Sequence, residues 1–403
     1  MSLALRQKKV LSANFLGRPD DTRFYGPAFP SDKRITRNMQ NHPENVTIRS
    51  FDLVSQGQPL EKRERVFLSS TLRPDDALIQ IAGCGVCHTD LGFIYDGVRT
   101  GSPLPLTLGH EISGVVVQAG QNRQALIGQK VVVPAVIPCG ECLLCKKGRG
   151  SICRKQIFPG SDVAGGFASH LVVPGHCLCV VDEAMLSQSG LTLPDLSVLA
   201  DAVSTPYQAV VRSGLGKGDT AIVVGAGGVG GFAVQIAHAL GANVIALDVS
   251  EERLSAISAY GAKHCVCTKG RDPNDVRKEI SAYVKAQGLN PLEWKIFECS
   301  GHPGGQTQAF TLLTFGAFLS VVGYTLEKVQ LRISNLMAFD ATAQGNWGCV
   351  PSLYPDALQL ILSSQIKLLP FIERRPLSSI NTTVHELHDG LLRKRPVLVP
   401  DFS

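Results

Sequence analysis

The sequence lacks any apolar run long enough to cross a bilayer, and no apolar export segment opens it. These absences argue against a membrane protein and against a secreted one, so we expect a cytoplasmic protein. In a reducing cytoplasm the twelve cysteines stay as thiols instead of forming a disulfide scaffold. They are therefore available to bind metal.

The body of the chain also lacks net charge. Residues 1–38 hold eight Lys or Arg against three Asp, an excess of +5 that equals the formal charge of the whole chain. A neutral remainder offers no basic groove for nucleic acid and no basic face for a membrane surface. We expect neither of these partners.

The first 38 residues lack a sustained helical or strand period, and they mix charges with Gly and Pro. We predict that residues 1–38 are an N-terminal extension and are disordered. Two alternatives are an Arg-rich targeting peptide and a true start at Met39. The acids and the scarcity of Ser argue against the targeting peptide.

Internal repeats and low-complexity segments are absent as well, and the remaining chain shows two patterns. From about residue 40 to 200, short Val/Ile runs are punctuated by Gly and Pro, which is typical of strands. Beyond Tyr207, five apolar runs alternate with segments of helical length; the runs are 221–224, 244–247, 264–267, 295–299 and 318–322. This alternation predicts an α/β protein with a strand-rich part and a doubly wound parallel sheet.

A glycine motif follows the first of these runs and precedes a helical pattern over 231–240; it consists of Gly225, Gly227, Gly228 and Gly230. Glycines let the backbone approach a pyrophosphate, and the helix N-terminus offers free N–H groups. Asp248 ends the next run, where a carboxylate would bind the ribose hydroxyls of a dinucleotide and repel a 2′-phosphate. The motif therefore predicts a Rossmann domain that binds NAD in preference to NADP.

Cysteines and their neighbours indicate metal. The four thiols of a C-x2-C-x2-C-x7-C pattern can surround one tetrahedral zinc; they are Cys139, Cys142, Cys145 and Cys153. Further residues of zinc-ligand type stand at Cys87, His110 and Asp201. The stretch Cys84-Gly-Val-Cys87-His88 also matches the haem-attachment pattern and a redox pair. The missing export signal argues against haem, and a strand-rich setting argues against a redox pair.

Several motifs stand together in one order: GVCHTD, GHE, the four-cysteine segment and GxGGxG. Over about residues 40–403 the chain in this respect resembles the zinc-containing medium-chain alcohol dehydrogenases. The resemblance implies a GroES-like catalytic domain over 39–203, completed by 348–403, and an NAD-binding Rossmann domain over 204–347. It also implies a homodimer or homotetramer.

The resemblance implies two zinc ions, one catalytic and one structural, and a role for each matching residue. Cys87, His110 and Asp201 would hold the catalytic zinc, with Glu111 beside it. Asp90 would orient His110, and Thr89 would receive the substrate proton. Cofactor contacts would come from His88, Thr205, Val229, Arg253 and Arg395, in addition to the glycines and Asp248.

Two positions depart from the common pattern of the family. Asp201 stands where most members have a cysteine, and a helix-capping role is the alternative for this carboxylate. Aspartate donates less electron density than thiolate, so the zinc would be a stronger Lewis acid. Gly92 stands where many members have the histidine that ends the proton relay.

Within the family, the run 83–114 is most like that of members that oxidise a cyclic hydroxyacyl-CoA, so the expected partner is a small-molecule acyl-CoA. Cations that could bind its phosphates lie at Arg99, Lys146, Lys147, Arg149, Arg154 and Lys155. An equally good interpretation is that these basic residues face solvent at the edge of the site and bind no phosphate. Other open functions are generic alcohol or polyol oxidation, hydration of a conjugated acyl-CoA, and NAD binding without catalysis.

Overall fold

The computed structural model describes residues 45–402 of the 403-residue chain. These residues belong to one compact unit, Pro43–Ser403. The predicted N-terminal extension, residues 1–38, lies outside the described residues.

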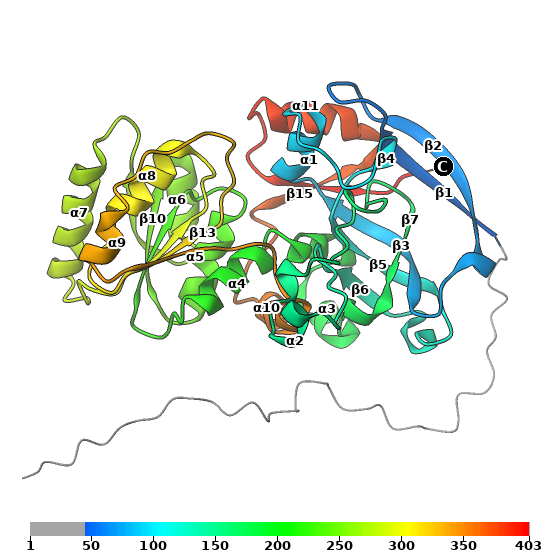
Figure 1. Ribbon diagram of the computed structural model, residues 1–403, viewed down its shortest axis with the longest axis horizontal. Helices are drawn as coiled ribbons and strands as arrows, with labels where there is room; N and C mark the ends of the chain where they lie inside the picture. The colour runs from blue at the N-terminus through cyan, green and yellow to red at the C-terminus, as the bar shows by residue number, and fades with distance from the viewer. Residues whose placement is uncertain (1–44, 403) are drawn as a thin grey trace, which may run out of the picture. The chain divides into compact units, whose positions relative to one another are not determined.

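The part of the unit outside the predicted nucleotide-binding segment is built on two sheets (Figure 1). The smaller has the order β2-β1-β4, with β1 (Asn45–Leu53), β2 (Glu61–Leu68) and β4 (Leu106–Thr107). The larger has the order β15-β16-β3-β5-β6-β8, with β7 on β3. Its strands are β3 (Asp76–Gly85), β5 (Glu111–Ala119), β6 (Lys130–Val133), β7 (His170–Pro174), β8 (Cys179–Val180), β15 (Ile372–Pro376) and β16 (Arg395–Val399).

A six-stranded sheet of order β11-β10-β9-β12-β13-β14 lies wholly within residues 204–347, and every pairing in it is parallel. Its strands are β9 (Thr220–Val224), β10 (Asn243–Asp248), β11 (Ala262–Cys267), β12 (Lys295–Glu298), β13 (Phe318–Val321) and β14 (Thr342–Gly345). The first five coincide with the apolar runs in the sequence. β14, which reads TAQG, was not predicted.

The helices of the described chain are mostly short. The α-helices are α1 (His88–Ile94), α2 (Leu143–Lys146), α3 (Glu183–Ser189), α4 (Ser204–Arg212), α5 (Gly230–Ala239), α6 (Glu251–Ser258), α7 (Pro273–Ala286), α8 (Pro303–Thr311), α9 (Ser334–Ala338), α10 (Tyr354–Leu362) and α11 (Ile380–His388). The described chain also has seven 3-10 helices: η1 (Ser69–Thr71), η2 (Gln124–Leu126), η3 (Gly150–Ile152), η4 (Gly175–Cys177), η5 (Leu193–Ala200), η6 (Pro351–Leu353) and η7 (Leu377–Ser379).

Both faces of the parallel sheet are buried, and the side chains of β9 alternate between them. Ala221 and Val223 pack in the cluster that contains Phe232 of α5. Ile222 and Val224 pack in the cluster that contains Ile280 of α7. Because helices cover both faces, each strand can be apolar throughout. The predicted fold class, a strand-rich GroES-like part and a doubly wound Rossmann part, is confirmed.

One apolar cluster joins the two parts of the unit. It includes Leu196 of η5, Val203, Phe232 of α5 and Val397 of β16, all of them almost fully buried. Asp201 lies between η5 and α4, so a chain segment fixed on both sides by this core carries it. Such anchoring favours a side chain held in one position, which a metal ligand needs.

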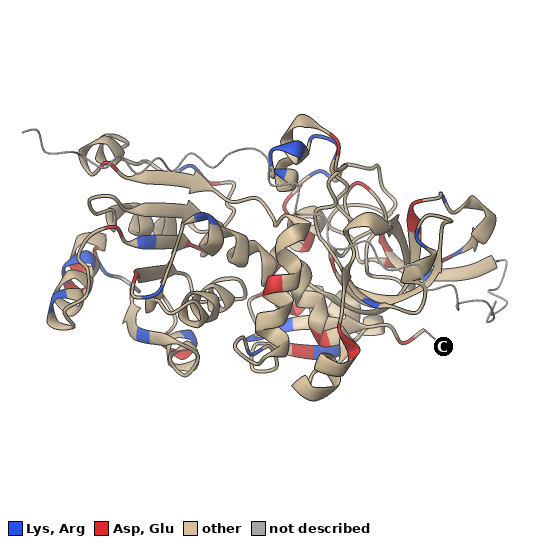
Figure 2. Ribbon diagram, turned by 90° about the horizontal axis from the view of Figure 1, so that it is seen from below, with Lys and Arg blue, Asp and Glu red and all other residues tan. Residues whose placement is uncertain are grey.

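Charged side chains of both signs are interspersed over the described chain (Figure 2). None of the helices between residues 45 and 402 is both long enough and apolar enough to span a bilayer.

Candidate metal centres and cofactor site

Two groups of side chains in the described residues bring possible metal-ligand atoms within 4.8 Å of one another. One is Cys139, Cys142, Cys145 and Cys153; the other is Cys87, His110, Glu111 and Asp201. The structure thus brings together each of the two sets that the sequence indicated.

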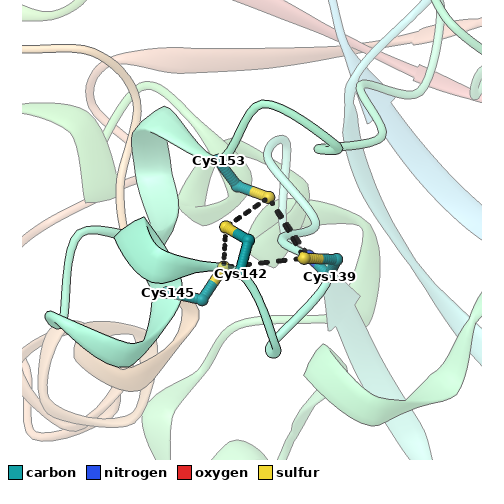
Figure 3. Close-up of side chains that lie close together, drawn as sticks. All are labelled: Cys139, Cys142, Cys145 and Cys153. Atoms are coloured by element: carbon teal, nitrogen blue, oxygen red, sulfur yellow. Dashed lines mark hydrogen bonds between the residues drawn. The ribbon is translucent and has the colours of Figure 1, made fainter.

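The four-cysteine group closes a small lobe around α2 and η3 (Figure 3). Its sulfur–sulfur distances are 3.5 to 3.9 Å. A disulfide would require about 2.05 Å, whereas four sulfurs around one zinc at about 2.3 Å lie about 3.8 Å apart. Backbone N–H groups near Cys142, above all that of Cys145, lower the pKa of the Cys142 thiol to about 6. The group therefore fits a zinc ion with no open position.

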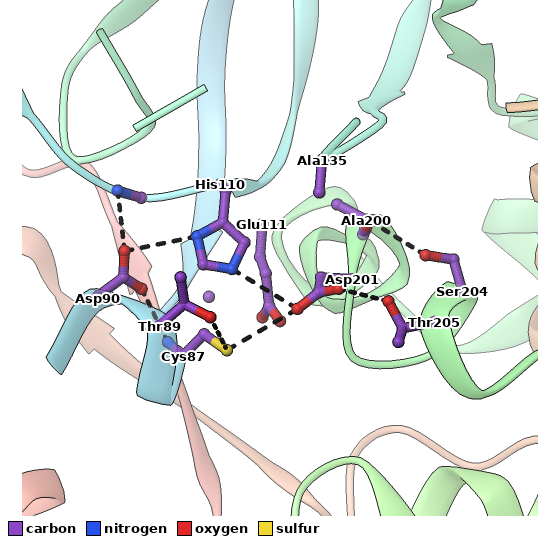
Figure 4. A network of polar contacts seen from close by, with 12 residues as sticks. Cys87, Thr89, Asp90, His110, Glu111, Ala135, Ala200, Asp201, Ser204 and Thr205 are labelled. Carbon is purple, nitrogen blue, oxygen red and sulfur yellow. Dashed lines mark hydrogen bonds and ion pairs between the residues drawn. The ribbon is translucent and has the colours of Figure 1, made fainter. Parts of the chain in front are cut away.

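The second group combines ligands from three separate chain segments (Figure 4). Cys87 precedes α1, His110 precedes β5, and Asp201 follows η5. The Asp201 Oδ2 atom lies 3.8 Å from Cys87 Sγ and 3.6 Å from His110 Nε2. Ligand atoms at zinc distances in a tetrahedron lie roughly 3.4 to 3.8 Å apart. These three donors fit a zinc ion that keeps a fourth position for substrate.

Asp90, in the first turn of α1, connects two of these ligands. Its carboxylate accepts hydrogen bonds from the backbone N–H of Cys87 at 2.9 Å and of Gly109 at 3.2 Å. Asp90 Oδ1 also lies 3.5 Å from His110 Nδ1. One fully buried carboxylate thus positions both the segment before α1 and the segment before β5.

Asp201 does not occupy the N-cap position of the helix that follows it, which is Val203. Instead its Oδ1 atom accepts a 2.5 Å hydrogen bond from the Thr205 hydroxyl, which leaves Oδ2 directed at Cys87 and His110. His110, although almost fully buried, has no good hydrogen-bond partner for either ring nitrogen. Buried polar atoms without partners are uncommon, and a metal bound at Nε2 would satisfy one of them.

Glu111 lies behind these ligands and pairs with a buried arginine. Its Oε1 atom accepts a 2.7 Å hydrogen bond from Arg395 of β16, while Oε2 has no partner. Gly85 makes room for this carboxylate, since a Cβ atom there would lie 2.0 Å from Oε2. Burial raises the pKa of Glu111 to about 7, although Arg395 acts in the opposite direction.

Burial and neighbouring charges act in opposite directions on the pKa values of His110 and Asp201. Burial alone would lower the pKa of His110, but Asp90 and Asp201 raise it well above the usual value. Burial alone would raise the pKa of Asp201, but contact with His110 lowers it to about 2. The carboxylates therefore favour a positive charge beside them, and a metal ion bound to the neutral His110 ring would supply that charge in place of a proton.

The glycine motif lies between β9 and α5, as the sequence predicted. A Cβ atom at Gly225, where φ is +90°, would meet the backbone of Ser300 at 2.7 Å, and one at Gly230 would collide with the Gly225 carbonyl. Gly227 has only the Arg253 guanidinium nearby, and Gly228 faces that of Arg395. The outer glycines thus pack the fold, whereas the inner two leave an open surface flanked by arginines.

Asp248 ends β10 and is almost fully buried. Its carboxylate accepts hydrogen bonds from Ala226 N–H at 2.7 Å and from Ser250 N–H at 2.9 Å, and Arg253 lies 3.8 Å away. The residue therefore fixes the glycine turn as well as facing the cleft. From the sequence we predicted only that Asp248 contacts the cofactor, and not that it fixes the glycine turn.

All the cofactor residues indicated by the sequence except Gly230 line one cleft of about 3260 Å³, together with Cys87, Thr89 and Asp201. His88 is exposed to this cleft, and its pKa is lowered by partial burial, then by Arg395 and Arg253. The Thr89 hydroxyl lies 3.8 Å from Cys87 Sγ. The metal ligands and the glycine turn thus open onto one shared space.

The sequence placed the Cys84–His88 stretch in a strand-rich setting. In the structure this stretch joins the end of strand β3 to the start of helix α1. Of the basic residues named for phosphate binding, Arg99 and Arg149 line the cleft, while Lys146, Lys147, Arg154 and Lys155 do not. At Gly92, a Cβ atom would lie 3.3 Å from Val98, so a neighbouring side chain occupies the nearby space.

Sequence reasoning also missed a polar network beside α4. The side chain of Gln208 donates to the carbonyl of Gly348 at 2.9 Å and accepts from the N–H of Val350 at 2.9 Å. Arg212 donates to the Gly345 carbonyl and to Asn346 Oδ1. Polar side chains at helical spacing were the only available signal, and their partners lie more than 130 residues away.

Comparison with known proteins gives concordant findings. A family model described as "Alcohol dehydrogenase GroES-like domain" matches residues 73–183, and one described as "Zinc-binding dehydrogenase" matches residues 228–363. An alcohol dehydrogenase of Geobacillus stearothermophilus is 28% identical over 328 residues, covering 81% of this chain and 92% of its own. The L-threonine 3-dehydrogenase of Bacillus subtilis (strain 168) is 29% identical over 333 residues, covering 81% and 91%.

A solved structure agrees in fold. The alcohol dehydrogenase zinc-binding domain protein from Burkholderia ambifaria superimposes with a TM-score of 0.76 at 25% identity, covering 89% of this chain and 100% of its own.

Proposed function

Because this chain belongs to the zinc-containing medium-chain alcohol dehydrogenases, we propose that it oxidises a secondary alcohol with NAD at the cleft-facing site of Cys87, His110 and Asp201. The observation that carries the proposal is the position of Asp201 Oδ2, 3.8 Å from Cys87 Sγ and 3.6 Å from His110 Nε2. Cys87 and Asp201 line the same cleft as the glycine turn.

The chain's own residues would bind and orient both reactants. Gly227 and Gly228 allow a pyrophosphate to approach the N-terminus of α5, where Arg253, Arg395 and the nearby His88 supply donors. Asp248 would accept hydrogen bonds from the ribose hydroxyls, and this carboxylate favours NAD over NADP. Thr205 and Val229 line the same cleft and would flank the nicotinamide.

Thr89 would accept the proton of the substrate hydroxyl and release its own to water in the cleft, because its hydroxyl faces the cleft beside Cys87 Sγ. Asp90 would keep Cys87 and His110 in place through its two backbone hydrogen bonds. Zinc, when bound, supplies a Lewis acid that lowers the pKa of the alcohol, and NAD supplies the hydride acceptor.

We propose as substrate 6-hydroxycyclohex-1-ene-1-carbonyl-CoA, oxidised to the 6-oxo acyl-CoA in anaerobic benzoyl-CoA degradation. The support is the resemblance over residues 83–114 and at Asp201 to the dehydrogenase of that compound. A cleft of about 3260 Å³ also leaves room for a large substrate beside the cofactor. Generic alcohol or polyol oxidation is the second candidate, favoured by the relatives named above.

The test compares NAD-dependent oxidation of this acyl-CoA with that of its free acid, cyclohexanol and benzyl alcohol. We expect kcat/KM to be highest for the acyl-CoA, because binding energy from the remote nucleotide helps to hold the ring. A simple alcohol that is oxidised as efficiently would leave only the second candidate. Acyl-CoA consumption without NADH formation would indicate hydration instead.

We further propose that the chain acts as a homodimer or homotetramer. β14 is the last strand of its sheet, its residues are largely exposed, and exposed apolar side chains precede it at Tyr324, Leu326, Ile333 and Met337. Unpaired strand edges and apolar patches favour association. Sedimentation of the purified protein would establish the number of copies.

A further inference from the structure

Two arginines from distant segments line the cleft, close enough that the charge of one acts on the other. Arg149 belongs to the four-cysteine lobe, immediately before η3, and Arg212 ends α4. Both line the cleft. The segments are also linked by packing, because a Cβ atom at Gly150 would contact Val350, whose N–H is bound by Gln208 of α4.

Neither arginine has an acidic partner among residues 45–402. The Arg149 side chain makes no hydrogen bond or ion pair there, and Arg212 contacts only the Gly345 carbonyl and Asn346 Oδ1, at 3.3 and 3.2 Å. Partial burial, and after it the charge of Arg149, lowers the pKa of Arg212. Two guanidinium groups that repel each other without a carboxylate between them leave donors free for an anion.

The position of Arg212 relative to the metal ligands is set by one helix face. Asp201, Thr205, Gln208 and Arg212 recur at helical spacing, and all four line the cleft. The N–H of Thr205 donates to the Asp201 carbonyl, which places Asp201 one turn before Thr205, although α4 itself begins at Ser204. At 1.5 Å per residue, Arg212 lies about 16 Å along the axis from the metal ligand.

This spacing suits the arm of an acyl-CoA. The pantetheine chain between the thioester sulfur and the first phosphate oxygen has the extended length of about four residues, roughly 14 Å. A ring hydroxyl at Asp201 would therefore bring the substrate phosphates near Arg212. Trp347, which is 53% exposed and follows the loop that Arg212 holds, offers an aromatic face for adenine.

We propose that Arg149 and Arg212 form a phosphate-binding site for the nucleotide part of the substrate. The site is separate from the cofactor pyrophosphate site at Gly227 and Gly228, where Arg253 and Arg395 lie. The proposal rests on acyl-CoA oxidation as the function of the cleft, and it assigns substrate specificity to these two residues.

The first test is direct binding of adenosine 3′,5′-bisphosphate, which has no thiol to bind zinc, to the zinc-loaded, NAD-saturated protein by calorimetry. We expect Arg149→Gln and Arg212→Gln each to weaken binding about tenfold, the effect of losing one charge-assisted contact. Arg154→Gln is the matched control: it removes the same charge from the same lobe outside the cleft. NAD affinity should be unchanged in all three variants.

The second test compares kcat/KM for the acyl-CoA and for its N-acetylcysteamine thioester, which lacks the phosphates. Arg149→Gln should lower only the first, about tenfold, and should weaken its dependence on salt. If the acyl-CoA is oxidised but Arg149→Gln and Arg212→Gln behave like Arg154→Gln, the site is refuted and the proposed function stands.

Two further outcomes would count against the proposed substrate. If the bisphosphate binds through both arginines but no acyl-CoA is oxidised, the phosphate site is supported and the proposed substrate is wrong. If the bisphosphate does not bind the wild-type protein and no acyl-CoA is oxidised, both are wrong.

Discussion

At the scale of single residues, Asp201 is the ligand whose replacement is most informative. Its Oδ2 atom faces Cys87 and His110, while Oδ1 is held by Thr205. We expect Asp201→Ala to remain folded and to bind NAD, yet to lose at least about 100-fold in turnover, because a site with two protein donors holds zinc poorly. Asp201→Cys, which restores a zinc ligand, should recover part of the activity. NADH formation and NAD titration check both variants; full activity in Asp201→Ala would refute the assignment.

Asp90 is a second informative residue, because it positions the metal ligands without being one of them. It touches Cys87 and Gly109 through their backbones and lies 3.5 Å from His110 Nδ1. Asp90→Asn can accept at only one atom, so we expect zinc affinity to fall about 10 to 100-fold, as for other groups that orient a ligand. Competition with a chelator measures this loss. Unchanged zinc affinity would show that Asp90 serves only to begin α1.

At the scale of elements, we expect the lobe around α2 and η3 to depend on a zinc ion bound by its four cysteines. α2 has four residues, none of them buried, and Leu143 is 67% exposed. So little apolar packing leaves the zinc as the main stabilising contact. Cys145→Ser should therefore make the lobe sensitive to limited proteolysis, whereas Cys177→Ser, outside the lobe, should not. Equal resistance in the two variants would contradict the structural role.

At the end of β10, we expect Asp248 to select NAD over NADP. Asp248→Ser removes the carboxylate that would repel a 2′-phosphate, so the ratio of kcat/KM for NAD over NADP should fall at least tenfold. Absolute values for NAD should fall too, because Ala226 N–H loses its acceptor. The paired cofactor assay in wild type and variant checks this. A wild-type enzyme that used both cofactors equally would show that Asp248 does not select.

The strands of the parallel sheet show how much of the fold could be predicted from the sequence. Buried parallel strands such as β9 are continuous apolar runs, so five of six were predictable. β14 was not, because a mostly exposed strand at the edge of the sheet needs no apolar residues. The metal ligands could be named because their chemistry is specific. Arg149 was one of six cations named for phosphate binding, but its pairing with Arg212 could not be predicted, since it depends on which arginines the fold brings to one cleft.

At the scale of the whole molecule, the central claim is that one chain carries two zinc sites of different kind. The four-thiolate group offers a closed shell of donors, whereas Cys87, His110 and Asp201 leave a position for substrate in the cleft. The apolar cluster that holds η5, α4 and α5 together places the second site beside the glycine turn. With both sites occupied, stability and catalysis would depend on separate metals.

The most direct measurement is anomalous X-ray scattering at the zinc edge from crystals of the purified protein. The account predicts two peaks for each chain, one among Cys139, Cys142, Cys145 and Cys153, and one among Cys87, His110 and Asp201. A single peak, or a second peak whose ligands do not include Asp201, would contradict it.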